Sequence, residues 1–179
     1  MYRPADHILV IFGASGDLTR RKLLPALKEL QKLKLLPGKF AVLGIGRTEY
    51  GDESFREMIA GQMEDADPML PLLHYLTLDP AKKDTYARLG KRLEQLRAEL
   101  GIKDNYIFYL ATPPSLYGTV PLFLSDAGLT EEKGRGWKRI IIEKPFGTDF
   151  DSAHKLNKTL LQRLKEHQIY RIDHYLGKE

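Results

Sequence analysis

The chain has 179 residues, 42% of them hydrophobic, and a formal net charge of +4 at pH 7, which suits one globular domain with a sizeable core. It has no cysteine, so a disulfide framework and a thiolate metal site are excluded, and we expect no metal. Because no apolar run approaches the roughly 20 residues of a membrane span and residues 1–7 lack the pattern of a signal peptide, we expect a cytoplasmic protein without a membrane partner.

The charges are unevenly distributed along the chain. Lysine and arginine crowd residues 20–39, whereas residues 49–67 are acidic. The basic residues lack interleaved aromatic side chains and a recognition motif, so we expect no nucleic-acid partner. A local site for an anion accounts better for the basic segment.

The first predicted element is a strand over residues 8–12, which runs into a turn containing Gly13 and Gly16 and then into a helix. Glycine permits backbone angles and close approaches that a Cβ would forbid, so successive N–H groups of the turn can point at a phosphate beside the positive end of the helix. The usual dinucleotide fingerprint has a third glycine, and here Asp17, Leu18 and Thr19 follow instead. A turn that only connects strand and helix is the alternative.

Pro25 stands too far into this helix to be a first-turn residue if the helix begins at Asp17. We therefore predict a break near Lys22 and Leu24. Such a break would leave Lys22 at the rim of the phosphate turn.

A second apolar run, residues 40–45, predicts a buried parallel strand with Arg47 just after its carboxyl end. In dinucleotide sites an acidic residue at this place binds the ribose 2′-hydroxyl, whereas an arginine suits an added 2′-phosphate. Arg47 therefore favours NADP over NAD. The alternative is that Arg47 is only an exposed loop residue. NAD is not excluded as the cofactor, because the acidic Glu49 stands two residues later.

The rest of the chain continues to alternate between helical and strand patterns. We predict helices over residues 52–67 and 86–100, a helix capped at Ser115 and a helix capped by Asp149 or Asp151, with strands over residues 74–78, 106–111, 137–142 and 169–172. This order predicts an α/β fold of Rossmann type: a doubly wound, mainly parallel sheet with helices on both faces, in one domain over residues 1–179.

In an open parallel sheet, ligands bind outside the carboxyl ends of the strands. The unusual clusters each follow a predicted strand: the turn at 13–16, Arg47, Thr112 to Pro114, Lys144 with Pro145, and Asp173 with His174. The sequence therefore predicts one site at this edge. The cis or trans state of Pro113, Pro114 and Pro145 is left open.

Three segments stand out as motifs: Gly-Ala-Ser-Gly-Asp-Leu at 13–18 with Arg-Lys-Leu at 21–23, Ile-Ile-Glu-Lys-Pro-Phe-Gly at 141–147, and Arg-Ile-Asp-His-Tyr-Leu-Gly-Lys-Glu at 171–179. With residues 109–114, they resemble the amino-terminal part of the glucose-6-phosphate dehydrogenase family over essentially the whole chain. The resemblance implies NADP-dependent oxidation of glucose 6-phosphate at carbon 1 to the 6-phosphogluconolactone, the first step of the pentose phosphate pathway.

The resemblance also implies roles for particular residues. Those that hold NADP would be Gly13, Ala14, Ser15, Gly16, Asp17, Leu18, Arg47, Ala111, Pro113 and Lys144. Those that hold glucose 6-phosphate would be Lys22, Lys144, His174, Tyr175 and Lys178. Asp173 would orient a histidine that takes the hydroxyl proton as general base.

By the same resemblance, the histidine base lies beyond Glu179, in a second, carboxyl-terminal domain. We therefore expect the chain to be the coenzyme part of a longer, homo-oligomeric enzyme, and to bind NADP with little turnover of its own. Thr19 stands where the family more often has alanine, and we expect it to crowd the helix turn slightly. Two alternatives stay open: another NADP-dependent sugar dehydrogenase with a Glu-Lys-Pro turn, and a stand-alone module that senses NADP without chemistry.

Overall fold

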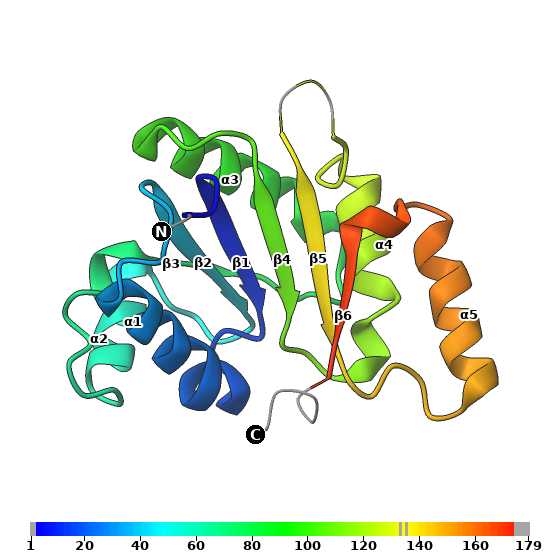
Figure 1. The fold of residues 1–179 in the computed structure, drawn as a ribbon, viewed down its shortest axis with the longest axis horizontal. Coiled ribbons are helices and arrows are strands. Elements are labelled where there is room, and N and C mark those ends of the chain that lie inside the picture. The colour runs from blue at the N-terminus through cyan, green and yellow to red at the C-terminus, as the bar shows by residue number, and fades with distance from the viewer. Residues whose placement is uncertain (1–2, 133, 135, 174–179) are drawn as a thin grey trace.

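The computed structural model describes residues 3–132, 134 and 136–173, which form a six-stranded sheet. The strands are β1 (His7–Phe12), β2 (Phe40–Gly46), β3 (Leu73–Thr77), β4 (Tyr106–Leu110), β5 (Lys138–Glu143) and β6 (Ile169–Ile172). Their order across the sheet is β3-β2-β1-β4-β5-β6, and every neighbouring pair is parallel (Figure 1). The predicted Rossmann-type fold is confirmed.

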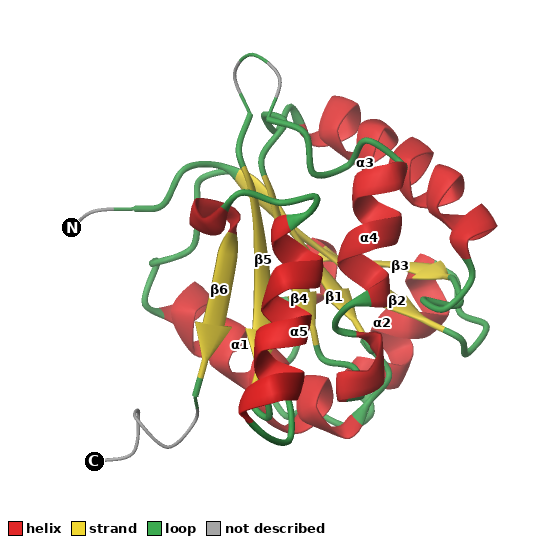
Figure 2. Ribbon diagram, turned by 90° about the vertical axis from the view of Figure 1, so that its right-hand side faces the viewer, coloured by secondary structure: helices red, strands yellow, loops and turns green. Residues whose placement is uncertain are grey.

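Helices lie on both faces of the sheet. They are α1 (Leu24–Lys32), α2 (Asp52–Ala60), α3 (Tyr86–Leu100), α4 (Thr119–Asp126) and α5 (Phe150–Leu161). One core packs α1 and α2 against one face, and a second core packs α3, α4 and α5 against the other (Figure 2). No helix in the described part of the chain is long and apolar enough to cross a bilayer.

Alternation along the strands divides the apolar side chains between these two cores. In β1, Val10 and Phe12 pack with α3 and α4, whereas Ile11 points to the side of α1 and α2. Because both of its faces are covered, β2 is buried at every residue.

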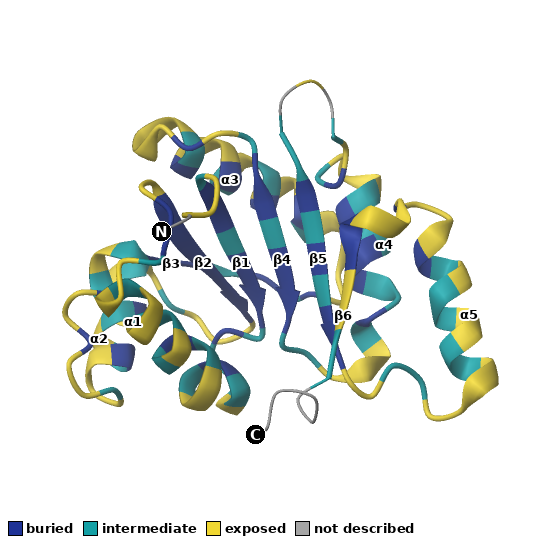
Figure 3. Cartoon of the chain, viewed as in Figure 1, coloured by how far each residue is buried: buried dark blue, intermediate teal, exposed yellow. Residues whose placement is uncertain are grey.

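One face of the sheet is less covered over β4, β5 and β6. On the side of α1, Ile107 and Ile141 are only partly buried and Tyr170 is 49% exposed, whereas Ile140 and Ile142 on the opposite face of β5 are fully buried (Figure 3). Two cavities of about 490 and 330 Å³ are both lined by Ile107 and Ile141. We call the surface formed by Ile107, Ile141 and Tyr170 the open face.

Two predicted element boundaries were wrong. The helix expected over residues 52–67 ends at Ala60, because Gly61 follows and the chain then turns. Ser115 caps no helix: it lies inside the tight turn Pro114–Leu116, and α4 begins only at Thr119. Asp149 does cap α5, since its carboxylate accepts a hydrogen bond from the Ser152 amide at 2.8 Å.

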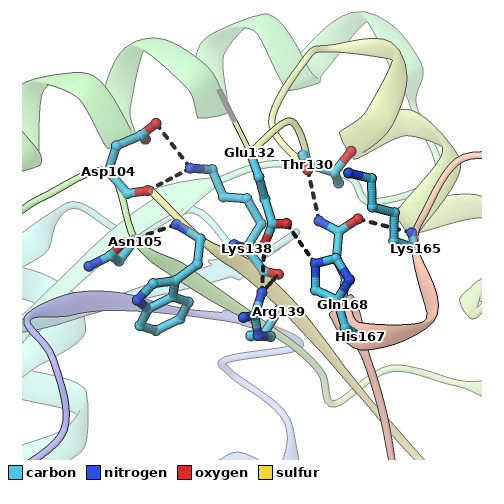
Figure 4. A network of polar contacts seen from close by, with 10 residues as sticks. Asp104, Asn105, Thr130, Glu132, Lys138, Arg139, Lys165, His167 and Gln168 are labelled. Atoms are coloured by element: carbon cyan, nitrogen blue, oxygen red, sulfur yellow. Dashed lines mark hydrogen bonds and ion pairs between the residues drawn. The ribbon is translucent and has the colours of Figure 1, made fainter. Parts of the chain in front are cut away.

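A polar network ties together the amino ends of β4, β5 and β6 (Figure 4). Glu132 accepts hydrogen bonds from the Lys138 amide at 3.0 Å, the Arg139 guanidinium at 2.6 Å and His167 Nε2 at 2.7 Å. The Lys138 side chain is 2% exposed and donates from Nζ to the carbonyl oxygen of Asp104 at 2.6 Å. This network fixes the edge opposite to the carboxyl ends of the strands.

Candidate functional site

The predicted clusters share the carboxyl edge of the sheet, the lower edge in Figure 1. The glycine turn follows β1, Arg47 follows β2, Ala111 to Pro114 follow β4, Lys144 follows β5, and Asp173 follows β6. The chain reverses its direction of winding between β1 and β4, which are neighbours in the sheet. This is where an open parallel sheet forms its ligand crevice.

The glycine turn is fixed by its own backbone. The amides of Gly13 and Ala14 donate to the carbonyl oxygen of Ile45 at 2.8 and 3.0 Å, and the Gly16 amide donates to the Gly13 carbonyl at 2.9 Å. Those three N–H groups are therefore engaged within the protein. The amides of Asp17 and Leu18, in the first turn of the helix, are better placed to face an anion, because first-turn N–H groups lack partners within a helix.

Gly13 meets two requirements that only glycine satisfies here. Its φ is +89°, in the region that other residues rarely adopt. A Cβ at this position would lie 2.1 Å from the carbonyl oxygen of Ala111, at the end of β4. The turn can therefore pack directly on the strand across the crevice.

The predicted break near Lys22 and Leu24 is wrong, because the chain stays helical from Asp17 through Pro25. A π-helical turn, Thr19–Leu23, precedes α1, and the Leu24 amide donates to the Thr19 carbonyl five residues back. This wider turn accommodates Pro25, which has no N–H to donate. Lys22 is exposed on it and pairs with no described residue.

The loop after β2 is held beside the glycine turn. The Thr48 carbonyl accepts hydrogen bonds from Tyr75 Oη at 3.0 Å and Thr77 Oγ1 at 3.3 Å, and the Ser15 and Thr48 hydroxyls lie 3.5 Å apart. Burial raises the pKa of Tyr75, so its hydroxyl keeps the proton that it donates. Arg47 is exposed and forms no ion pair with any described residue, which leaves its guanidinium available to an anionic ligand.

Lys144 and Asp173, predicted from separate motifs, meet as an ion pair. Lys144 Nζ lies 2.6 Å from Asp173 Oδ2, and the Lys144 amide donates to the carbonyl of Ile172 at 3.2 Å. The Lys144 side chain is 60% exposed and the Asp173 side chain 21%, so the pair stands at the surface of the site. The Lys144–Pro145 peptide bond is cis, and His174, Tyr175 and Lys178 lie outside the described residues.

Sequence reasoning assigned no role to a buried pair beside Lys144. The Tyr109 hydroxyl donates a hydrogen bond to the carboxylate of Glu143, which is 6% exposed. Burial raises the pKa of Tyr109, and the Glu143 carboxylate raises it further. Alternation along β5 puts Glu143 on the same face as Ile141, but only the register of β4 against β5, in which Tyr109 lies opposite Ile141, brings Glu143 to the Tyr109 hydroxyl.

Two threonines at this edge were given no role in the site. Thr19, expected only to crowd the helix turn slightly, is fully buried at the start of the π-helical turn and donates from Oγ1 to the Gly13 carbonyl at 3.0 Å. The Thr112 hydroxyl, just after β4, is buried without a hydrogen-bond partner among the described residues. No local pattern marks the Thr19 contact or the burial of the Thr112 hydroxyl, since both depend on neighbours brought by the fold.

Comparison with known proteins agrees with this arrangement. Residues 10–179 match the family model described as "Glucose-6-phosphate dehydrogenase, NAD binding domain". The chain is 48% identical to glucose-6-phosphate 1-dehydrogenase of Aggregatibacter actinomycetemcomitans over 179 residues, which cover 96% of this chain and 36% of that protein. It is 45% identical to the enzyme of the same name from Treponema pallidum, covering 98% of this chain and 36% of that protein.

Solved structures give the same result. A glucose-6-phosphate dehydrogenase in complex with its substrate glucose 6-phosphate superposes with a TM-score of 0.86 at 33% identity, covering 100% of this chain and 38% of that one. Glucose-6-phosphate 1-dehydrogenase from Mycobacterium avium gives a TM-score of 0.79 at 31% identity, covering 97% of this chain and 37% of that one. The chain thus spans little more than a third of the length of these relatives. It belongs to the glucose-6-phosphate dehydrogenase family, to whose NAD-binding domain it corresponds.

Proposed function

We propose that this chain is the dinucleotide-binding part of an NADP-dependent glucose-6-phosphate dehydrogenase. The observation that carries the proposal is the gathering of the glycine turn, Arg47 and the Lys144–Asp173 pair at one edge of the sheet. A relative's solved structure is described as a complex with glucose 6-phosphate. The reaction would be oxidation of the sugar at carbon 1, and the bound cofactor would accept the hydride.

The residues of the site divide between the two ligands. The glycine turn with Asp17 and Leu18 would hold the pyrophosphate, Arg47 the 2′-phosphate, and Ala111 and Pro113 the part of the cofactor that crosses β4. Lys144 would lie between cofactor and sugar, with Lys22 and, outside the described residues, His174, Tyr175 and Lys178 on the sugar phosphate. A cationic set suits a phosphate dianion because charge-assisted hydrogen bonds to phosphate are strong.

The Lys144–Asp173 pair gives Asp173 a second task beside orienting a base. While the carboxylate contacts Nζ at 2.6 Å, it holds the ammonium group in place before the sugar arrives. The residue that would take the proton is expected in the longer relatives and not in these 179 residues. We therefore expect the chain to bind NADP with little or no turnover.

Calorimetric titration with NADP and NAD tests the proposal. The unaltered chain should bind NADP, and Arg47→Ala should weaken NADP by roughly tenfold while changing NAD little, because the charged contact to the 2′-phosphate is lost. Lys34→Ala, which removes an exposed cation outside the site, is the matched control. Equal losses for both dinucleotides would rule out the role of Arg47, and an absence of binding would rule out the cofactor assignment.

We infer further that the open face packs against the remaining polypeptide of the family's longer chains. A parallel sheet is normally covered on both faces, and Ile107, Ile141 and Tyr170 leave this one partly exposed. The relatives supply a candidate cover, since 36% of their length matches this chain. Assembly of the complete protein into a homo-oligomer remains a prediction, to be tested by sedimentation.

Mixing this chain with the carboxyl-terminal part of the Aggregatibacter relative tests the packing. Ile141→Lys should abolish complex formation in sedimentation velocity. Leu161→Lys, at a 43% exposed leucine on α5, should leave it unchanged. Association that survives Ile141→Lys would contradict this docking site, and dimers of the chain alone that Ile141→Lys abolishes would mean that a second copy occupies the face instead.

A further inference from the structure

We propose that Thr19 is a positioning residue for the phosphate-binding turn, acting through the carbonyl group of Gly13. The inference rests on the proposed function, because it concerns how that turn is held ready for the pyrophosphate of a dinucleotide. Thr19 touches the turn and not the ligand.

The Gly13 carbonyl is the point at which the turn and the helix are joined. It accepts the Gly16 amide at 2.9 Å, which closes the turn, and the Thr19 hydroxyl at 3.0 Å, which comes from the helix. The amides of Gly13 and Ala14 are meanwhile fixed to the Ile45 carbonyl at 2.8 and 3.0 Å. The peptide after Gly13 is thus held from both sides, and Thr19 supplies the only side-chain contact to this carbonyl among the described residues.

The π-helical turn explains how the Thr19 side chain reaches this carbonyl. Thr19 and Leu24 are five residues apart, yet they are 0% and 1% exposed. In a regular α-helix, a separation of five residues turns the side chains about 140° apart, onto different faces. The extra residue in the π turn brings them closer to one face, so Thr19 can point at the glycine turn while Leu24 packs in the core.

Pro25 fits the same arrangement. It follows Leu24 directly and has no N–H, so the regular hydrogen bond to the carbonyl four residues back cannot form there. The local loss of that bond favours the wider turn, because Leu24 bonds back to the Thr19 carbonyl instead. The backbone of Thr19 therefore anchors the π turn, and its side chain anchors the phosphate turn.

Loss of the Thr19 hydroxyl should weaken the binding of only those ligands that contain a pyrophosphate. Loss of the Thr19 hydroxyl removes the side-chain bond that joins the Gly13 carbonyl to the helix, which loosens the helix start whose Asp17 and Leu18 amides would face the pyrophosphate. The loop that carries Arg47 keeps the hydrogen bonds from Tyr75 and Thr77 to the Thr48 carbonyl. Removal of one well-aligned hydrogen bond of this kind corresponds to about a fivefold loss of affinity when the bond orders a binding site. A ligand that has a 2′-phosphate but no pyrophosphate should not be affected.

Titration of Thr19→Val and Thr19→Ser with NADP and with adenosine 2′-monophosphate tests the role. Valine keeps the shape and lacks the donor, so NADP should bind about fivefold more weakly while the monophosphate binds as before; serine should retain both affinities. Thr159→Val, at a hydroxyl that donates to the Lys155 carbonyl at 3.0 Å in α5, is the matched control and should change neither.

Hydrogen exchange of the Gly16 amide gives a second readout that is independent of ligand. Exchange should be faster in Thr19→Val than in the unaltered chain, with the amides of α5 unchanged. Equal NADP affinity in the unaltered chain and Thr19→Val would overturn the role of Thr19 alone, as would an equal loss for both ligands. If the unaltered chain bound no NADP, the proposed function would fall first and this role with it.

Discussion

Neutralising Glu132 should remove a pH-dependent part of the stability of the fold. Burial by itself would raise the pKa of this carboxyl, but hydrogen bonds from His167, the Lys138 amide and Arg139 outweigh burial and lower the pKa from 4.5 to about 2. At about 1.4 kcal/mol for each pKa unit, this difference amounts to about 3 kcal/mol. Because the side chain is 18% exposed, solvent screening lowers the expected contribution of Glu132 to stability to about 2 kcal/mol.

The direction in which stability changes with pH follows from proton binding by Glu132. The folded-state pKa lies below the unfolded value, so the contribution is complete above pH 4.5 and is lost as the pH falls towards about 2. Urea denaturation of the unaltered chain and Glu132→Gln should show a gap of about 2 kcal/mol at pH 7 that closes as the pH approaches 2. Glu57→Gln, on the exposed side of α2, should show no such gap. Parallel stability curves for the unaltered chain and Glu132→Gln between pH 7 and pH 3 would refute the reasoning.

Three further substitutions have defined outcomes. Asp52→Ala should lower the free energy of unfolding by about 2–3 kcal/mol in urea denaturation. The reason is that Asp52 accepts hydrogen bonds from His74 at 2.9 Å, Arg92 at 2.6 Å and the Tyr75 amide at 2.8 Å. A loss below about 0.5 kcal/mol would argue against this cluster. Gly13→Ala should cost roughly 2–5 kcal/mol of stability and abolish NADP binding in calorimetry, because the new Cβ would meet the Ala111 carbonyl. A variant that binds NADP normally would disprove the steric argument. Tyr75→Phe should weaken the binding of NADP about threefold and the binding of NAD less, because the Thr48 carbonyl loses a hydrogen-bond donor beside Arg47. An equal effect on both dinucleotides would exclude a role for this contact.

Much of the site could be located from the sequence because its parts follow strands. The apolar runs that became β1, β2, β4 and β5 are each followed by an unusual residue or turn, and parallel pairing then puts those residues at one edge. Some local caps were also visible: Asp149, one of two candidates, caps the start of α5, and Gly101 caps the end of α3 at φ +60°, whereas Ser115 caps no helix. These features depend on residues close together in the chain.

The sequence by itself determined the alternation of strands and helices, the glycine turn and the strand ends at which the candidate ligand groups stand, because side-chain period and glycine geometry act over a few residues. Tertiary structure alone decided that Glu143 pairs with Tyr109, that Lys144 pairs with Asp173, and that Thr19 bonds the Gly13 carbonyl across a π turn. Each of these contacts depends on strand register or on the rotation of a helix against its neighbour. A local pattern does not encode that rotation, because many packings satisfy the same apolar period, and only the assembled core selects one.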